Sequence, residues 1–183
     1  MAFTSGFNPH PVMTVAMPLS VGVTSECEYM KIGFAEDYKE DEIKTKLNDA
    51  FPDGFSVLAV RKLEGKEIDF NKISEAVYET EAECNDSSLF SADAFMKNES
   101  LLVMKKSKSG VKEADIRPYI YSLSAEIVSK DKINFTMRIA AGNEYNLKVD
   151  TVIDAICKYT EGFQITFFCS HRKTVLANGK ELM

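Results

Sequence analysis

The chain has 183 residues, of which 45% are hydrophobic and 27% are charged, a composition that suits one globular domain or two small ones and excludes a disordered chain. Its 22 basic and 28 acidic residues give a formal net charge of −6, which argues against a protein that coats nucleic acid through net charge alone. No apolar run approaches the roughly 18 residues of a membrane span, and the first residues lack the features of a secretion signal, so we predict a cytoplasmic protein without a membrane partner.

The first part of the chain alternates between extended and helical patterns. The expected elements are a strand at 12–17, a strand at 27–34, a helix at 39–51, a strand at 55–62 and a short helical passage at 69–76. These elements form most of a βαββαβ pattern, but its opening strand and helix are missing. We therefore expect a sheet with an unpaired edge, which a second copy of the chain would cover.

The second part of the chain gives a fuller βαββαβ pattern. The expected elements are strands at 77–84, 101–106, 116–128, 133–140 and 163–170, and helices at 89–98 and 149–160. In the strand at 133–140 the apolar side chains of Ile133, Phe135, Met137 and Ile139 fall on one face. We predict an α+β fold of two ferredoxin-like halves, residues 1–75 and 76–183, the first incomplete at its N-terminus.

The four cysteines are expected to be free, buried thiols. Cys27, Cys84, Cys157 and Cys169 are too far apart in sequence for a zinc knuckle or an iron–sulfur triplet. The chain has only two histidines, His10 and His171. We therefore predict no metal site and no cofactor.

Asn8 and His10 are the first candidate ligand-binding residues. They lie in the stretch Gly6-Phe7-Asn8-Pro9-His10-Pro11, in which two prolines hold the histidine in an extended backbone. Such a loop can present His10 as a hydrogen-bond partner or as a general acid or base. The alternative is a stiff connection in which His10 packs locally.

A basic stretch at residues 105–118 is the second candidate site. It carries five basic and two acidic residues in an acidic protein. The residues expected to contact a phosphate-bearing ligand or to line its site are Lys106, Lys108, Lys112, Asp115 and Arg117. Tyr119 and Tyr121 follow at strand spacing and offer stacking faces for bases. The alternative is a solvated hairpin in which Asp115 pairs with Arg117 or with a lysine.

The stretch at residues 6–11, followed by residues 17–26, 47–54 and 108–118, resembles the radical SAM-associated (radical SAM-linked) protein family, a domain of unknown function. The similarity covers essentially the whole chain in order. Family members carry a further strand and helix before this stretch. The resemblance therefore implies either a start codon inside a longer reading frame or an open edge that is covered in another way.

The resemblance implies an accessory or substrate-binding module that works with a radical SAM enzyme and presents RNA, with no activity of its own. Radical chemistry would belong to the partner, because no cysteine triplet for a cluster is present. Two alternatives stay open. One is a stand-alone enzyme that uses His10 with Asp115 or Arg117, and the other is a purely structural protein-interaction domain.

Overall fold

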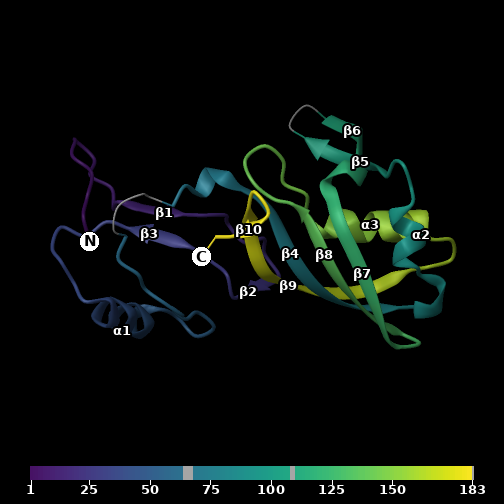
Figure 1. The fold of residues 1–183 in the computed structure, drawn as a ribbon, viewed down its shortest axis with the longest axis horizontal. Coiled ribbons are helices and arrows are strands. Elements are labelled where there is room, and N and C mark those ends of the chain that lie inside the picture. The colour runs from purple at the N-terminus through teal and green to yellow at the C-terminus, as the bar shows by residue number, and fades with distance from the viewer. Residues whose placement is uncertain (64–67, 108–109, 183) are drawn as a thin grey trace. The chain divides into compact units, whose positions relative to one another are not determined.

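The structure is a computed structural model and describes residues 1–63, 68–107 and 110–182 (Figure 1). It is a mixed α+β structure with several sheets and few helices. The chain divides into two compact units: the first contains Met1–Ala16 and Tyr29–Asp69, and the second contains Met17–Glu28 and Phe70–Met183. We expected a single boundary, after residue 75. In the structure the units divide after residue 69, and residues 17–28 belong to the second unit.

The second unit is built around a sheet in which the strands are ordered β10-β9-β4-β8-β7, with β2 added along β9. The strands of this sheet are β2 (Val23–Ser25), β4 (Ile73–Cys84), β7 (Ile120–Ser129), β8 (Lys132–Ala140), β9 (Ile165–Ala177) and β10 (Lys180–Glu181). Neighbouring strands are antiparallel, except that β2 runs parallel to β9. The strand expected at 163–170 is β9, which begins at Ile165 and continues through the basic residues 171–173 to Ala177.

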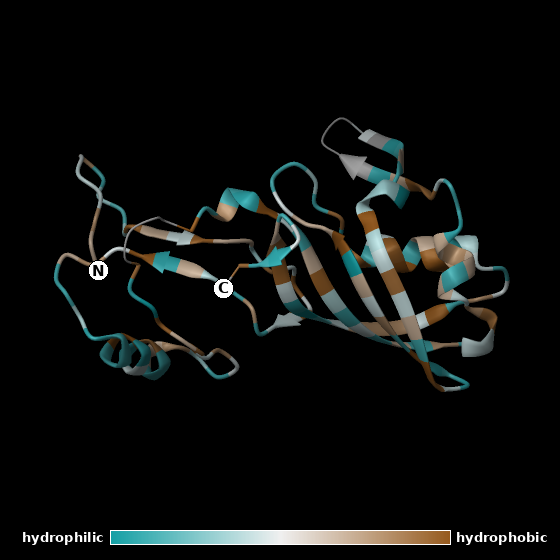
Figure 2. Cartoon of the chain, viewed as in Figure 1, coloured by the Kyte–Doolittle hydropathy of each residue, from teal (hydrophilic) through white to brown (hydrophobic). Residues whose placement is uncertain are grey.

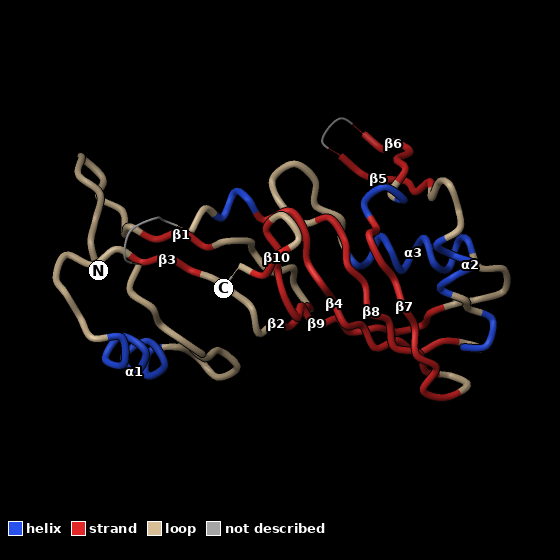
Figure 3. Tube along the Cα trace, viewed as in Figure 1, coloured by secondary structure: helices blue, strands red, loops and turns tan. Residues whose placement is uncertain are grey.

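Helices and a separate hairpin complete the second unit (Figure 3). The remaining elements are the 3-10 turns η1 (Phe70–Lys72), η2 (Ser87–Leu89) and η3 (Arg117–Tyr119), the helices α2 (Ala92–Met96) and α3 (Val149–Tyr159), and the hairpin β5 (Leu102–Ser107) with β6 (Gly110–Asp115). Strands and helices follow in the order β4, α2, β7, β8, α3, β9, and the hairpin is inserted between α2 and β7. The helix expected at 89–98 is shorter in the structure. Ser91 is its N-cap and accepts a hydrogen bond from the N–H of Ala94, so the helix begins at Ala92.

The core of the second unit lies between the sheet and α3. Ile133, Phe135, Met137 and Ile139 are all fully buried, which confirms the predicted face of this strand. The ring of Phe90 packs against Phe135 with centroids 5.3 Å apart and also contacts the rings of Phe95 and Phe163. On the other side of the sheet, polar side chains of β4 and β8 are exposed or half-buried. Along both strands, buried side chains thus alternate with more exposed ones, as expected for an antiparallel sheet with one solvated face.

Gly142 allows the loop after β8 to cross the start of β4. Its φ is 155°, and a Cβ atom at this position would lie only 2.2 Å from the carbonyl oxygen of Ile73. Any side chain here would clash with backbone. The close approach explains why a glycine stands at this point, directly after the buried residues 139–141.

The first unit is much less regular. It contains the two-stranded antiparallel ribbon of β1 (Met13–Val15) and β3 (Met30–Ile32), and the helix α1 (Glu40–Ala50). The helix is where we predicted it. The strand expected at 55–62 was wrong: within this segment the backbone N–H of Val57 donates to Asn48 Oδ1 and that of Lys62 to Glu40 Oε1, so side chains of α1 take the place of a pairing strand.

Two further expectations need correction. Cys169 is exposed and Cys157 is half-buried, so only Cys27 and Cys84 are the buried thiols that we predicted, although all four are free. The extended stretch expected at 116–128 begins with the turn η3, which contains Pro118, and β7 starts only at Ile120. Among the residues that the structure describes, no helix is long and apolar enough to cross a membrane.

Candidate functional site

The loop with Asn8 and His10 lies in the first unit, and both residues are exposed. The backbone closes it into a turn, because Thr4 N–H donates to the His10 carbonyl oxygen at 2.8 Å and His10 N–H donates to Thr4 Oγ1 at 3.0 Å. Phe3 and Pro11 form an antiparallel bridge at its base. The backbone of His10 is thus held in place, and its ring has no hydrogen-bond partner among the described residues.

The basic stretch forms the β5–β6 hairpin of the second unit. Lys112 is exposed and stands opposite Lys105 in the strand register. The ammonium group of Lys105 lies 4.2 Å from the ring centroid of Tyr145, which offers the cation an aromatic face. The side chain of Lys106 and the whole of Lys108 lie outside the described residues, so their predicted contacts stay predictions.

The base of the hairpin is firmly anchored to the rest of the unit. Leu101 and Val103 are buried, and the Lys158 ammonium donates to the carbonyl oxygen of Leu102 at 2.7 Å. The N–H of Leu102 donates in turn to the hydroxyl of Tyr159, also at 2.7 Å. Both anchoring side chains come from the end of α3. The hairpin is therefore fixed at its base.

Asp115 and Arg117 bind backbone groups of their own unit. Asp115 accepts hydrogen bonds from the N–H groups of Leu101 and Arg117, at 2.8 and 2.9 Å. The guanidinium of Arg117 donates to the carbonyl oxygens of Met96 and Ile120. These contacts tie the end of α2 to the start of β7. The geometry favours a positioning role for both side chains; their predicted ligand contacts are not tested by it.

Removing the Asp115 carboxylate should lower the stability of the second unit by about 1 kcal/mol at neutral pH, as expected for the loss of a side chain that caps backbone N–H groups. The N–H of Leu101, and then that of Arg117, hold the pKa of Asp115 below its ordinary value of 3.8. Since the folded pKa is the lower one, this stabilisation is present above pH 3.8 and is lost as the pH falls through the folded pKa.

Urea denaturation of the wild type and of Asp115→Ala between about pH 7 and about pH 2.5 measures this effect. The difference between the two proteins should shrink toward the acidic end. Asp115→Asn is the control, because it keeps one acceptor oxygen without the titration. A difference that does not change with pH would contradict the assignment.

Two tyrosine rings stack beside the hairpin. Tyr119 and Tyr145 are parallel within 2°, with centroids 3.5 Å apart. With Lys105 above it and Tyr119 against it, Tyr145 has neither face free for a nucleobase. Its hydroxyl is buried and has no hydrogen-bond partner in the described part of the chain. Tyr121 is 47% exposed, and the Arg138 guanidinium lies 5.9 Å from the centroid of its ring.

Arg172 is the site residue that sequence reasoning missed. It lies in β9, and its side chain is only 2% exposed. Its guanidinium donates to Glu28 Oε1 through both Nε and Nη2, and Nη2 also donates to the carbonyl oxygen of Met17 at 2.9 Å. Arg172 therefore holds the first and the last residue of the segment 17–28 at one point.

The neighbours of Arg172 complete this attachment. His171 Nδ1 lies 2.8 Å from the hydroxyl oxygen of Thr24, and Lys173 pairs with Glu26 at 2.6 Å. We call the contacts that residues 171–173 make with residues 17–28 the Arg172 clamp. Burial disfavours the charged guanidinium, but the hydrogen bonds and the charge of Glu28 outweigh burial and raise the pKa of Arg172. Burial raises the pKa of the nearby Tyr78 hydroxyl.

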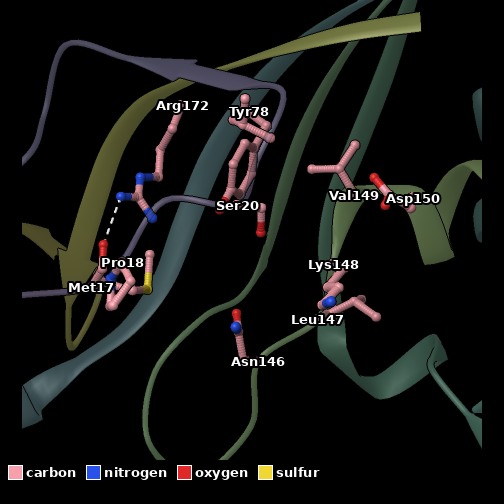
Figure 4. Close-up of a pocket in the computed structure, with 11 residues that line it drawn as sticks. Met17, Pro18, Ser20, Tyr78, Asn146, Leu147, Lys148, Val149, Asp150 and Arg172 are labelled. Carbon is pink, nitrogen blue, oxygen red and sulfur yellow. Dashed lines mark hydrogen bonds between the residues drawn. The ribbon is translucent and has the colours of Figure 1, made fainter. Parts of the chain in front are cut away.

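A small pocket lies beside the clamp (Figure 4). It is lined by Arg172, Tyr78, Ser20, residues 17–18, Val23 and residues 146–150 at the start of α3. Its volume of about 20 Å³ holds a single water molecule. A larger groove of about 340 Å³ lies between the start of α2 and β7, lined among others by Phe90, Leu123 and Ile127. The clamp pocket is too small for a substrate.

The first unit presents an unusual surface. None of its described residues, 1–16, 29–63 and 68–69, is buried. Large apolar side chains are exposed throughout: Phe7 fully, Phe55 to 69%, Leu58 to 63% and Phe3 to 60%. Figure 2 shows apolar residues along the ribbon and loops of this unit. Neither the amphipathic helix nor the ribbon contributes a buried residue. The two elements therefore form no core of their own.

Comparison with known proteins gives a family but no individual relative. A family model described as "Uncharacterized protein conserved in bacteria (DUF2344)" matches residues 1–149. No curated protein and no solved structure matches the chain significantly. The match covers the whole first unit, the sheet through β8 and the hairpin, and it ends at the start of α3.

Proposed function

The chain belongs to DUF2344, a family of uncharacterized proteins conserved in bacteria, and we propose that it is an accessory binding module whose first unit docks on another polypeptide. The observation that carries this proposal is the exposure of the first unit. The described residues of this unit include no buried side chain that would offset the entropy of ordering the backbone, and several large apolar side chains are exposed, as is typical of protein interfaces.

The proposal includes a ferredoxin-like topology for the second unit. The order β9-β4-β8-β7, with helices after β4 and β8, supports a ferredoxin-like second half. The described residues of the first unit form one ribbon and one helix, and the unit would reach a comparable half only with added elements. The partner would supply them.

The partner that the sequence resemblance implies is a radical SAM enzyme, with RNA as the molecule presented to it. The exposed Lys112 and the anchored hairpin support an anion-binding role for the second unit, whereas the occupied faces of Tyr145 leave it no part in base stacking. A stand-alone enzyme is less well supported, because Asp115 and Arg117 already bind backbone groups.

Co-expression tests the proposal. The tagged chain should retain a radical SAM enzyme of the bacterium that encodes it, at a one-to-one ratio. Phe55→Ser with Leu58→Ser should weaken retention at least tenfold, because both side chains are exposed in the first unit. Phe167→Ser is the matched control, since this side chain is 60% exposed but lies in the second unit.

Equal loss with the Phe167 control, or no change with the first-unit pair, would contradict the proposal. The RNA part is tested separately by titrating a short structured RNA at two salt concentrations. Two or three phosphate contacts predict a slope of log K against log salt of roughly −1.5 to −2. No binding at low salt would remove RNA and leave the protein module.

A further inference from the structure

We infer that the partner enters as an extended strand, which pairs with the outer edge of β1 and carries apolar residues alternating with lysine or arginine. This inference rests on the proposed function and names the chemistry of the segment that the first unit takes. It is carried by the backbone of the β1–β3 ribbon, by its exposed side chains and by the charge of the unit.

The hydrogen bonds of the ribbon show which backbone groups face outward. Gly33 N–H donates to the Val12 carbonyl oxygen, and Ala16 N–H donates to that of Tyr29. Because the N–H and C=O of one residue in an antiparallel strand point to the same side, and successive residues alternate, those of Met13 and Val15 point away from β3. No described residue pairs with this edge.

The side chains of β1 are also uncovered. All three residues of β1 are exposed, with Met13 at 49% and Val15 at 46%, whereas two of the three residues of β3 are half-buried. An isolated two-stranded ribbon is marginally stable, and a third strand is the usual minimum for a stable sheet. A strand added at β1 would satisfy the outward backbone groups and cover Met13 and Val15 with its own apolar side chains.

Charge decides between a foreign strand and a second copy of the chain. The first unit carries 10 acidic and 7 basic residues, and α1 opens with Glu40, Asp41 and Glu42 without a basic residue in its last turn. Two copies would bring this acidic unit against itself. A segment with lysine or arginine at alternate positions complements it instead.

Two labelled nine-residue peptides test the inference by fluorescence anisotropy with the full chain. One alternates valine with lysine, and the other has glutamate in place of every lysine. The lysine peptide should bind at least tenfold more tightly than the glutamate peptide. Val15→Pro should abolish binding, because it removes an outward N–H without removing a bond to β3.

Failure of the lysine peptide to bind, equal binding of both peptides, or unchanged binding to Val15→Pro would overturn the inference. A doubled mass in sedimentation that Val15→Pro restores to that of a single chain would assign the edge to a second copy. If the peptides fail but the radical SAM enzyme is still retained through Phe55 and Leu58, the proposed function stands and only the strand mode falls.

Discussion

Replacing Arg172 with methionine is expected to lower the free energy of unfolding of the second unit by about 3 kcal/mol. The change leaves the carbonyl oxygen of Met17 without its donor and Glu28 without its cation. The Glu28 side chain is 37% exposed, so its carboxylate can be solvated once Arg172 is removed. The loss of unfolding free energy should therefore lie at the lower end of the range for a broken buried ion pair. Urea denaturation followed by circular dichroism measures it.

Lys173→Met is the matched control, because this neighbouring cation pairs with Glu26 at the surface and its loss should have a much smaller effect. Adding Glu28→Gln to Arg172→Met should change stability little further, since the pair is already broken. Equal losses for Arg172 and Lys173, or fully additive effects of Arg172 and Glu28, would show that the clamp does not hold residues 17–28.

Truncation of Phe135 should have a comparably large effect, while truncation of Phe55 should have almost none. Phe135 is fully buried and packs edge-on against Phe90, so Phe135→Ala should cost about 3 to 5 kcal/mol. Phe55 is 69% exposed in the first unit, so Phe55→Ala should change the stability of the free chain by less than about 0.5 kcal/mol.

Both variants are compared by the same urea titration in the absence of a partner. A loss of more than about 1.5 kcal/mol for Phe55→Ala would mean that the first unit has a core of its own, contrary to the exposure of its side chains. A loss below about 1 kcal/mol for Phe135→Ala would contradict the placement of the second-unit core.

The second unit was largely predictable because its signals are local. Strict alternation over a long strand marks the buried face of β8, and an apolar stripe marks α3, so both could be placed to within a few residues. Of the hairpin, β5 was expected as a strand at 101–106, whereas β6 was not among the expected strands. Alternation is informative where a strand has one covered face.

The Arg172 clamp could not be predicted from local signals. His171, Arg172 and Lys173 look like a solvated basic group at the end of a strand. Their partners lie about 145 positions earlier in the chain, in the segment 17–28. A buried arginine is recognisable from sequence only when the carboxylate that pairs with it is already known.

The first unit shows the opposite limit. Residues 55–62 alternate as a strand should, but a strand forms only where another strand offers its edge, and α1 supplies Asn48 and Glu40 instead. The apolar residues of β1 and of this segment led us to expect buried side chains. In the structure of the chain alone, large apolar side chains in both places are exposed. This mismatch between sequence and structure is what points to a partner.

Hydrogen exchange of the full chain, measured by mass spectrometry without a partner, tests most directly whether the first unit depends on a partner for its stability. If it does, amides of residues 1–16 and 29–63 should exchange at nearly the rate of an unfolded chain, while those of β4, β8 and β9 are protected to the global stability. When a partner is bound, the amides of Met13 and Val15 should gain protection. Protection of the first unit in the free chain equal to that of β4 and β8 would contradict this dependence.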